Sequence, residues 1–311
     1  MKPASPHIFT LTGNLLAERT LEFPRWAAGA TQRATSEIFQ VGGKGINVSK
    51  MLNRLGVPNT ALGFVGGPSG QACAAWLQQQ HLAHSLFTSA TTTRTGTVVR
   101  DASGACPETT FLGPDIPPDA VALQACATFL EEQPANQVLA ICGSFPGWSQ
   151  AAFDPLRAAL AHWANRGILI ADTYGPPLAW AVQHPLALIK INADEFREWG
   201  GEFAGNLPSL VARWVVSDGS KTVWLRDTSS GRTETMSPPR ITEVSATGSG
   251  DVLLAAIIHG WIIQALPFPE AVAAALPFAG ANAGHAGIAE FPDPPNVPTT
   301  RRSLLLQPRS P

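Results

Sequence analysis

Short apolar runs of strand length alternate with segments of helical periodicity in the middle of the chain, and this alternation restricts the fold more than any other feature. The strand-like runs cover 138–141, 168–171, 186–190 and 222–225, and helical segments such as 155–165 and 193–199 lie between them. Strands connected through helices run parallel. Nearly continuous apolar strands are typical of a sheet covered by helices on both faces. We therefore predict a doubly wound α/β fold with a mostly parallel sheet.

Two segments interrupt this rhythm, at 21–39 and 95–112, where Thr, Val and Phe alternate between Gly and Pro residues. We expect them to form antiparallel strands of a small β flap, spanning roughly 14–40 and 90–112. The tail over 292–311 is rich in proline, which cannot sustain a helix or an inner strand. The prediction is one domain over 1–311 with a flap and a proline-rich tail.

Composition excludes several functional classes. Hydrophobic residues make up 45% and charged residues 14% of the 311, as in a globular protein. The formal net charge of -2 gives no field that would attract nucleic acid or an anionic membrane. The four cysteines lack zinc or disulfide spacing, and neither a signal peptide nor a membrane-spanning run is visible. We expect a cytoplasmic protein with no nucleic-acid or membrane partner.

The strongest local signal is the run Gly248-Ser249-Gly250-Asp251, which opens an apolar helical segment over 252–266. Backbone N–H groups at a helix N-terminus are unsatisfied and the helix dipole is positive there, so such a turn can bind an oxyanion. Asp251 has two interpretations. It is either a simple helix cap, or a carboxylate that accepts a proton from a substrate hydroxyl beside the bound anion.

A second glycine-rich segment, Gly42-Gly43-Lys44-Gly45, precedes a helical pattern that stops at Gly56. It lacks the G-x-x-x-x-G-K-[ST] spacing of the Walker loop, and no G-x-G-x-x-G follows the first strand, which argues against a dinucleotide site. Lys44 and Asn47 carry groups that bind hydroxyls or phosphate. A purely structural turn is the alternative.

The segment at Gly42 and, later in the chain, the segment at Gly248 resemble the first and second signatures of the phosphofructokinase B (PfkB) carbohydrate kinases within the ribokinase-like superfamily. Ser49, Gly56 and Gly66 fall at the spacing of the first signature, whereas Ala246 departs from the second. Further short matches extend over most of the chain: Thr93-Arg94, Gly113-Pro114, Gly143-Ser144, Asp172-Thr173, Lys190, Asn192, Glu195, Ser217 and Gly219. The motifs are most similar to those of 1-phosphofructokinases and tagatose-6-phosphate kinases.

The resemblance implies an enzyme that transfers the γ-phosphoryl group of MgATP to a hydroxyl of a small sugar phosphate. Asp251 would be the general base, and Gly248, Ser249 and Gly250 would bind the transferred group. Asn192 and Glu195 would organise Mg²⁺, mostly through water. The implied cofactor-binding residues are Lys190, Asn192, Glu195, Ser217, Gly219 and Asn282. For Asn282, packing within a helix is the alternative.

The implied substrate-binding residues are Asn14, Glu18, Gly43, Lys44, Asn47, Arg94 and Ser144. Three of the departures from the family pattern concern the sugar side: Glu18 replaces an Asp, and Gly96 and Val98 stand where phosphosugar kinases often have Asn and Lys. Lys44 and Arg94 remain as cations for a substrate phosphate, although Arg94 could instead pair with a carboxylate of the flap. The departures leave open a kinase of an unphosphorylated sugar or nucleoside, and a non-catalytic sensor is a more distant alternative.

The flap also bears on assembly. Flap strands that project from the sheet would expose apolar edges, and pairing of two flaps would cover them and give a homodimer.

Overall fold

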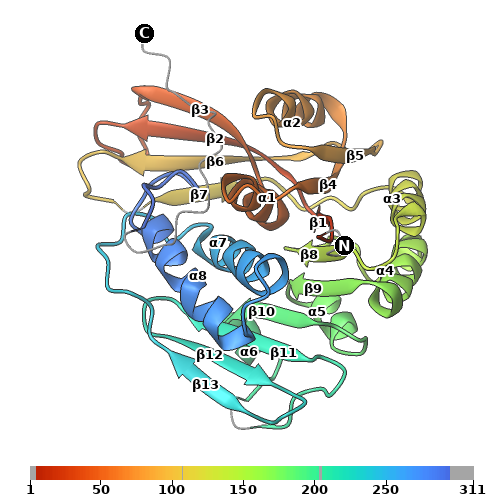
Figure 1. Cartoon of the computed structure of the whole chain (residues 1–311). Helices are drawn as coiled ribbons and strands as arrows, with labels where there is room; N and C mark the ends of the chain where they lie inside the picture. Colours follow the sequence, from red (N-terminus) through yellow and green to blue (C-terminus); the bar gives the residue numbers. More distant parts are fainter. Residues whose placement is uncertain (1–4, 107, 203–204, 295–311) are drawn as a thin grey trace.

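A nine-stranded sheet runs through the middle of the molecule in the order β13-β12-β11-β10-β9-β8-β1-β4-β5 (Figure 1). This computed structural model describes residues 5–106, 108–202 and 205–294. All pairings from β5 to β11 are parallel, which confirms the predicted fold class. The strands are β1 Ile8–Thr12, β4 Asn59–Val65, β5 His84–Thr88, β8 Val138–Cys142, β9 Ile168–Asp172, β10 Leu188–Asn192, β11 Arg213–Asp218, β12 Thr222–Asp227 and β13 Thr233–Met236.

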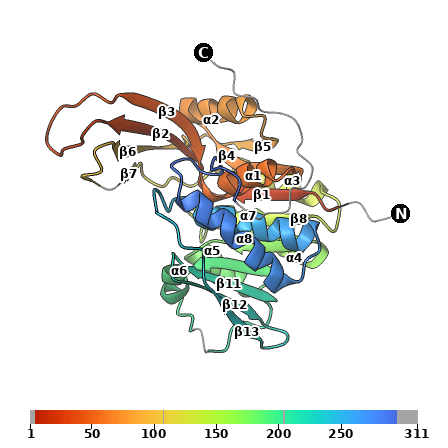
Figure 2. The ribbon, with the colours of Figure 1, turned by 60° about the vertical axis from the view of Figure 1, so that its left-hand side comes forward.

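Helices cover both faces of this sheet (Figure 2). One face is packed by α1 (Lys44–Arg54), α7 (Ser249–Ile258) and α8 (Phe268–Ala283). The other face is covered by α3 (Ala120–Glu132), α4 (Asp154–Arg166), α5 (Pro176–Ala181) and α6 (Ala193–Glu198), while α2 (Gly67–Gln79) packs near β4 and the flap. Both faces of the strands are therefore buried, as continuous apolar runs require.

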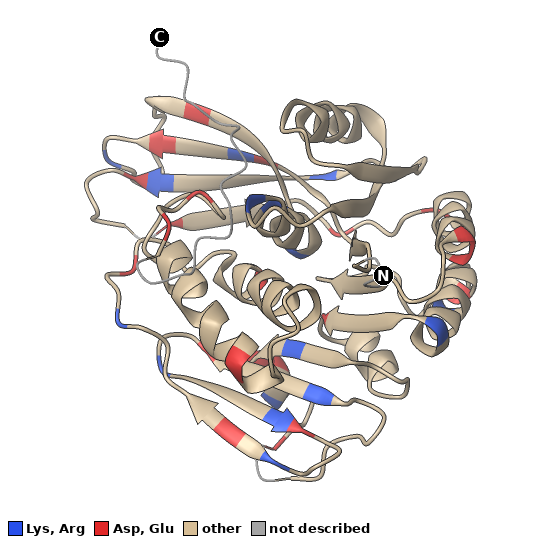
Figure 3. Cartoon of the chain, viewed as in Figure 1, with Lys and Arg blue, Asp and Glu red and all other residues tan. Residues whose placement is uncertain are grey.

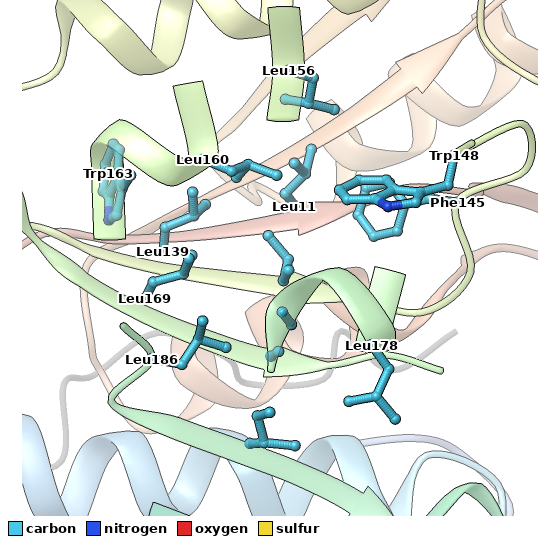
Figure 4. Packing of buried hydrophobic residues seen from close by; sticks show 14 of the residues in the cluster. Leu11, Leu139, Phe145, Trp148, Leu156, Leu160, Trp163, Leu169, Leu178 and Leu186 are labelled. Atoms are coloured by element: carbon cyan, nitrogen blue, oxygen red, sulfur yellow. The ribbon is translucent and has the colours of Figure 1, made fainter. Parts of the chain in front are cut away.

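The larger core lies between the sheet and α3 to α6. Figure 4 shows Leu139 of β8 and Leu169 of β9 beneath Leu160 and Trp163 of α4. These four side chains are at most 1% exposed. The helix predicted after the Gly248-Ser249-Gly250 run begins at Ser249 as α7 and continues as a π-helical turn over His259–Ile263.

The direction predicted for the strand at 222–225 is wrong. β12 pairs with β11 and with β13 in the antiparallel sense. A tight turn causes this reversal: Gly219 has φ of 52°, and the Lys221 amide donates to the Asp218 carbonyl at 2.9 Å. A connection this short cannot cross over to a parallel strand.

The segments predicted to form a flap contain four strands that make a separate sheet in the order β3-β2-β6-β7. Their bounds are β2 Leu16–Phe23, β3 Ser36–Gly42, β6 Arg94–Asp101 and β7 Thr109–Leu112. The outer pairs are antiparallel, but the central pair β2–β6 is parallel, so the prediction of antiparallel strands throughout is wrong. The reason is that β2 and β6 follow β1 and β5, which themselves point in the same direction in the main sheet.

The remaining sequence predictions concern the tail, the cysteines and the charge. Residues 295–311 of the tail lie outside the described residues, whereas Asp293 pairs with Arg54 of α1 at 2.7 Å. All four cysteines are free thiols. Lys and Arg residues and Asp and Glu residues are both scattered over the molecule (Figure 3). None of the helices in the described ranges is long and apolar enough to cross a membrane.

Candidate active site

The two glycine-rich segments meet at one edge of the main sheet. β8, β9 and β10 end there at Cys142, Asp172 and Asn192, because the carboxyl ends of parallel strands share an edge. The first residue of α1, Lys44, lies in this region, since its Nζ is 2.7 Å from Asp172. The N-terminus of α7 also points here. Ligands of open α/β sheets bind at this edge, which places the candidate site.

Glycine is required at the start of α7. Gly248, its N-cap, has φ of 74°, and a Cβ atom there would lie 2.7 Å from Ile288. A Cβ atom on Gly250 would collide with the Nζ of Lys190. No side chain caps this helix. The structure thus brings an uncapped helix N-terminus against a lysine ammonium, a combination that suits an anion.

Asp251 lies in the first turn of α7 and is 5% exposed. Its Oδ2 accepts a hydrogen bond from Asn47 Nδ2 at 2.7 Å. Burial raises the pKa of Asp251 to about 7, and the negative charge of Asp172 adds to the rise, whereas Lys190, Lys44 and the Asn47 hydrogen bond oppose it. Because Gly248 is the N-cap and Asn47 holds the carboxylate, the simple capping interpretation does not apply. A carboxylate with this pKa can accept a proton near neutral pH.

A chain of ion pairs lies beside Asp251, buried at Asp172 and Lys190 and partly exposed at Lys44 and Glu195. Asp172 binds Lys190 at 2.8 Å and Lys44 at 2.7 Å, and Lys44 also binds Glu195 at 2.9 Å. Burial alone would raise the pKa of Asp172, but the two lysines outweigh it and lower the pKa. Burial opposes the charge of Lys44, yet Asp172, Glu195 and Asp251 raise its pKa above the usual value.

This chain changes the interpretation of Lys44, which was expected to bind substrate phosphate. Its ammonium is already held by two carboxylates. The sequence analysis gave no role to Asp172, the residue that organises both lysines. The sequence signal that could have identified Asp172 is its position as an acidic residue at the carboxyl end of a buried strand, β9.

Asn192 and Glu195 form a reciprocal capping box at the start of α6, in which each side chain accepts from the other's backbone amide. The second oxygen of Glu195 accepts from Lys44. Across the residues that the structure describes, no group of three or more His, Cys, Asp or Glu is placed to hold a metal ion. Ser217 lies next to Asn192 in the β10–β11 register, and Gly219 follows in the turn after β11.

Asn282 of α8 is 1% exposed, and its amide group is fully engaged with the protein. It donates to the Thr247 carbonyl at 3.0 Å and to Ser249 Oγ at 3.1 Å, and it accepts from the Ala289 amide at 2.9 Å. Asn282 therefore holds the loop before α7 in place. This structural role differs from both direct nucleotide contact and the packing alternative.

Three of the residues predicted for the sugar side, Asn14, Arg94 and Ser144, are linked around Asp115, a carboxylate that the sequence analysis missed. Asn14 Nδ2 donates to Asp115 at 2.8 Å and to Ser144 Oγ at 3.1 Å. Arg94 also pairs with Asp115 at 2.8 Å. The structure therefore shows the alternative in which Arg94 pairs with a carboxylate. That carboxylate, Asp115, lies after β7 rather than within the flap strands.

The three departures from the family pattern lie on two neighbouring flap strands. Glu18 of β2 is opposite Gly96 of β6, and it accepts a hydrogen bond from Gln40 of β3. A Cβ atom on Gly96 would lie 2.9 Å from Leu16. Val98 is 5% exposed. Two polar positions of the phosphosugar pattern are thus replaced here by a glycine without room for a side chain and by a buried valine.

Comparisons with known proteins identify the family of this chain. A family model for pfkB family carbohydrate kinases matches residues 13–294. The 1-phosphofructokinase of Borreliella burgdorferi is 26% identical over 265 residues, which cover 82% of this chain and 84% of that protein. The D-tagatose-1-phosphate kinase of Bacillus licheniformis is 42% identical over 64 residues, 21% of each chain.

Among solved structures, phosphofructokinase-2 from Escherichia coli in complex with potassium has a TM-score of 0.80 at 22% identity, covering 91% of this chain and 94% of that chain. Ribokinase from Thermotoga maritima has a TM-score of 0.68 at 18% identity, covering 92% and 96%. These two likenesses show the ribokinase-like fold. Because the family model spans nearly the whole described chain, the protein belongs to the pfkB family of carbohydrate kinases and is a phosphotransferase.

Proposed function

We propose that this kinase transfers the γ-phosphoryl group of ATP to a hydroxyl of a small sugar phosphate, with Asp251 as general base. The observation that carries the proposal is a buried carboxylate, with its pKa raised to about 7, in the first turn of an uncapped glycine-rich helix. A base with this pKa is half ionised near neutral pH. This arrangement supports proton removal and anion binding within one helical turn.

The residues present fit a nucleotide phosphate. Gly250 lets the ammonium of Lys190 lie directly against the start of α7, since a Cβ atom there would collide with Lys190 Nζ. Magnesium would lie near the carboxylates of Asp172 and Glu195 and would be held mostly through water, since both carboxylates already bind lysines. When bound, MgATP supplies the phosphoryl group and neutralises part of its charge.

The chain's own groups then have distinct tasks. Asn47 orients Asp251 through its 2.7 Å hydrogen bond, so that one carboxylate oxygen remains to accept the sugar hydroxyl proton. Lys190 and the amides of Gly248 and Gly250 offset negative charge on the transferred group, whereas the Ser249 amide donates to the Ala246 carbonyl at 3.2 Å. Asn282 fixes the loop that carries those amides.

For the substrate, we propose a ketose phosphate of the fructose-1-phosphate or tagatose-6-phosphate type. Arg94 supports this choice, because its guanidinium lies beside Asn14 and Ser144 through the shared partner Asp115. The named activities of the relatives from Borreliella and Bacillus, both sugar-phosphate kinases, support it further. The test is ATP consumption by the purified chain against a panel of free and phosphorylated sugars and nucleosides. No turnover with any phosphorylated ketose would contradict the proposal.

One observation favours a second candidate, a kinase of an unphosphorylated sugar. Lys44 and Arg94, the two cations expected to hold a substrate phosphate, are both already paired with carboxylates. Val98 occupies a position where a further cation would be typical. Equal or better turnover of a free sugar in the same panel would favour this candidate.

We also propose that the protein acts as a homodimer in the cytoplasm, joined through the flap. Ile38 and Leu112 are 58% and 56% exposed. The strand register places both on the flap face that also carries Arg94. Gly96 and Val98 share this face of β6 with Arg94, because side chains at every second position point the same way. Leu112 is paired with Gly96, and Ile38 is paired through Thr20 with Val98. Exposed apolar residues on one sheet face are typical of an interface.

A further inference from the structure

The β6–β7 hairpin of the flap reaches the loop that precedes α7. Arg100, near the end of β6, donates from Nε to Glu108 at 2.8 Å and from Nη2 to the Ala286 carbonyl at 2.7 Å. The other oxygen of Glu108 accepts from Thr247 Oγ1 at 3.4 Å and from Ser245 Oγ at 3.5 Å. We call the pair Arg100 and Glu108 the flap bridge.

The flap bridge contacts the part of the loop that matters for anion binding. Thr247 directly precedes Gly248, the N-cap of α7. Asn282 holds the carbonyl of Thr247 from the side of α8, and Glu108 holds its hydroxyl from the side of the flap. The side chains of Arg100 and Glu108 are 29% and 22% exposed, so solvent screens their attraction only partly. Both α8 and the flap therefore contact this loop at Thr247.

The same flap strand also carries the candidate sugar-side arginine. Arg100 comes six positions after Arg94, and side chains at every second position of a strand share a face, so both lie on one face of β6. At the rise of a strand, their Cα atoms are about 20 Å apart. β6 thus extends from the cluster around Asp115 to the loop before α7, and a shift of the flap would act on both ends.

We propose that Arg100 and Glu108 are positioning residues that hold the anion-binding loop in its transfer-competent geometry as long as the flap is in place. This inference rests on the proposed phosphoryl transfer at Asp251 and adds a physical connection between the sugar side and the phosphoryl side of the site. The two residues touch no reacting group themselves. They act through Thr247 and the amides that follow it.

The first test does not depend on activity. Amide hydrogen exchange is measured over residues 243–252 in the wild type, Arg100→Ala, Glu108→Ala and the matched control Arg19→Ala. The control removes a flap ion pair, with Glu37, that does not reach the loop. We expect faster exchange over 243–252 in both bridge variants and wild-type exchange there in the control. Equal exchange in all four proteins would overturn the inference.

The second test is kinetic and applies to the full chain. We expect kcat to fall about fivefold or more in each bridge variant, the double variant to be no worse than the worse single one, and Arg100→Lys to recover part of the loss. Fold-losses that multiply in the double variant would show two independent roles and would overturn the inference. Thermal unfolding of each variant identifies any general loss of folding. A wild type without kinase activity would refute the proposed function. The hydrogen-exchange result would still show whether Arg100 and Glu108 hold the loop before α7.

Discussion

Asn47 and Asp251 lie 204 residues apart in the sequence, yet the amide nitrogen of one is 2.7 Å from the carboxylate of the other. The contact joins the first turn of α1 to the first turn of α7. Both glycine-rich segments thus contribute to one acid–base unit. The orientation of the proposed base depends on a helix from the opposite end of the chain.

Replacing Asp251 by Asn should lower kcat by about 10²- to 10⁴-fold, the usual range for a positioned proton acceptor. Nucleotide affinity should persist, because the backbone cradle and Lys190 are unchanged. Steady-state kinetics and calorimetric titration with ATP would check this, with the exposed Asp154→Asn as control. A variant that turns over at nearly the wild-type rate would remove Asp251 from the mechanism.

The pH dependence of kcat/KM should show an acid limb near pH 7, because only ionised Asp251 can accept a proton and burial raises its pKa to about 7. Activity should fall as the pH drops below this value. The Asn47 hydrogen bond favours the ionised form and lowers this pKa, so Asn47→Ala should move the acid limb to higher pH. A limb that stays in place, or moves to lower pH, would contradict the assigned contact.

Glu195→Gln should raise the magnesium concentration required for half-maximal activity, because one negative charge near the proposed ion is lost. The capping box with Asn192 can survive, since a Gln side chain still accepts from the backbone amide. Titration of magnesium at saturating ATP is the measurement. An unchanged titration curve would leave Glu195 as a structural residue only.

Arg94→Ala should reduce the preference for a phosphorylated over a free ketose in kcat/KM by at least about tenfold, with little change in the KM for ATP. Asp115→Asn removes the carboxylate partner of Arg94 while keeping the arginine. This second variant should keep or increase the preference. If Arg94→Ala is indifferent to the substrate phosphate, then Arg94 is structural and the unphosphorylated sugar is favoured.

Ile38→Lys combined with Leu112→Lys should dissociate the proposed homodimer, because both side chains are exposed on one flap face. Sedimentation velocity at micromolar concentration would distinguish the dimer from the 32.8 kDa monomer. Val121→Lys on α3, which is also exposed, is a matched control. A wild type that sediments only as the monomer would exclude the dimer without affecting the kinase assignment.

The parts of the site that are contiguous in sequence could be predicted from sequence. Gly248 to Asp251 precede a buried helix, and local pattern alone identifies such a helix start. The partners of Lys44 could not be predicted in this way. Asp172 arrives from the end of β9, and only the strand order brings the two residues together. The same holds for Asp115, whose contacts with Asn14 and Arg94 depend on where the chain returns after β7.

The parallel core was predictable because strands buried on both faces must be apolar throughout. Strand direction outside that core depends on connections. The Gly219 turn reverses β12, and the short distance between Asp218 and Thr222 in sequence was a usable signal. No comparable signal marks the parallel pairing of β2 with β6, since it is inherited from the parallel alignment of β1 and β5.

That parallel central pair has a consequence for how the protein folds. β2 and β6 are separated in the chain by β3, α1, β4, α2 and β5, so the two strands cannot meet as a hairpin before those elements are assembled. Long loop closure slows such pairing. The flap should therefore form late, after the β1-β4-β5 region has docked. A pulse-labelling experiment would find its amides protected last, and the flap face that carries Arg94 would be complete only after the main sheet has formed.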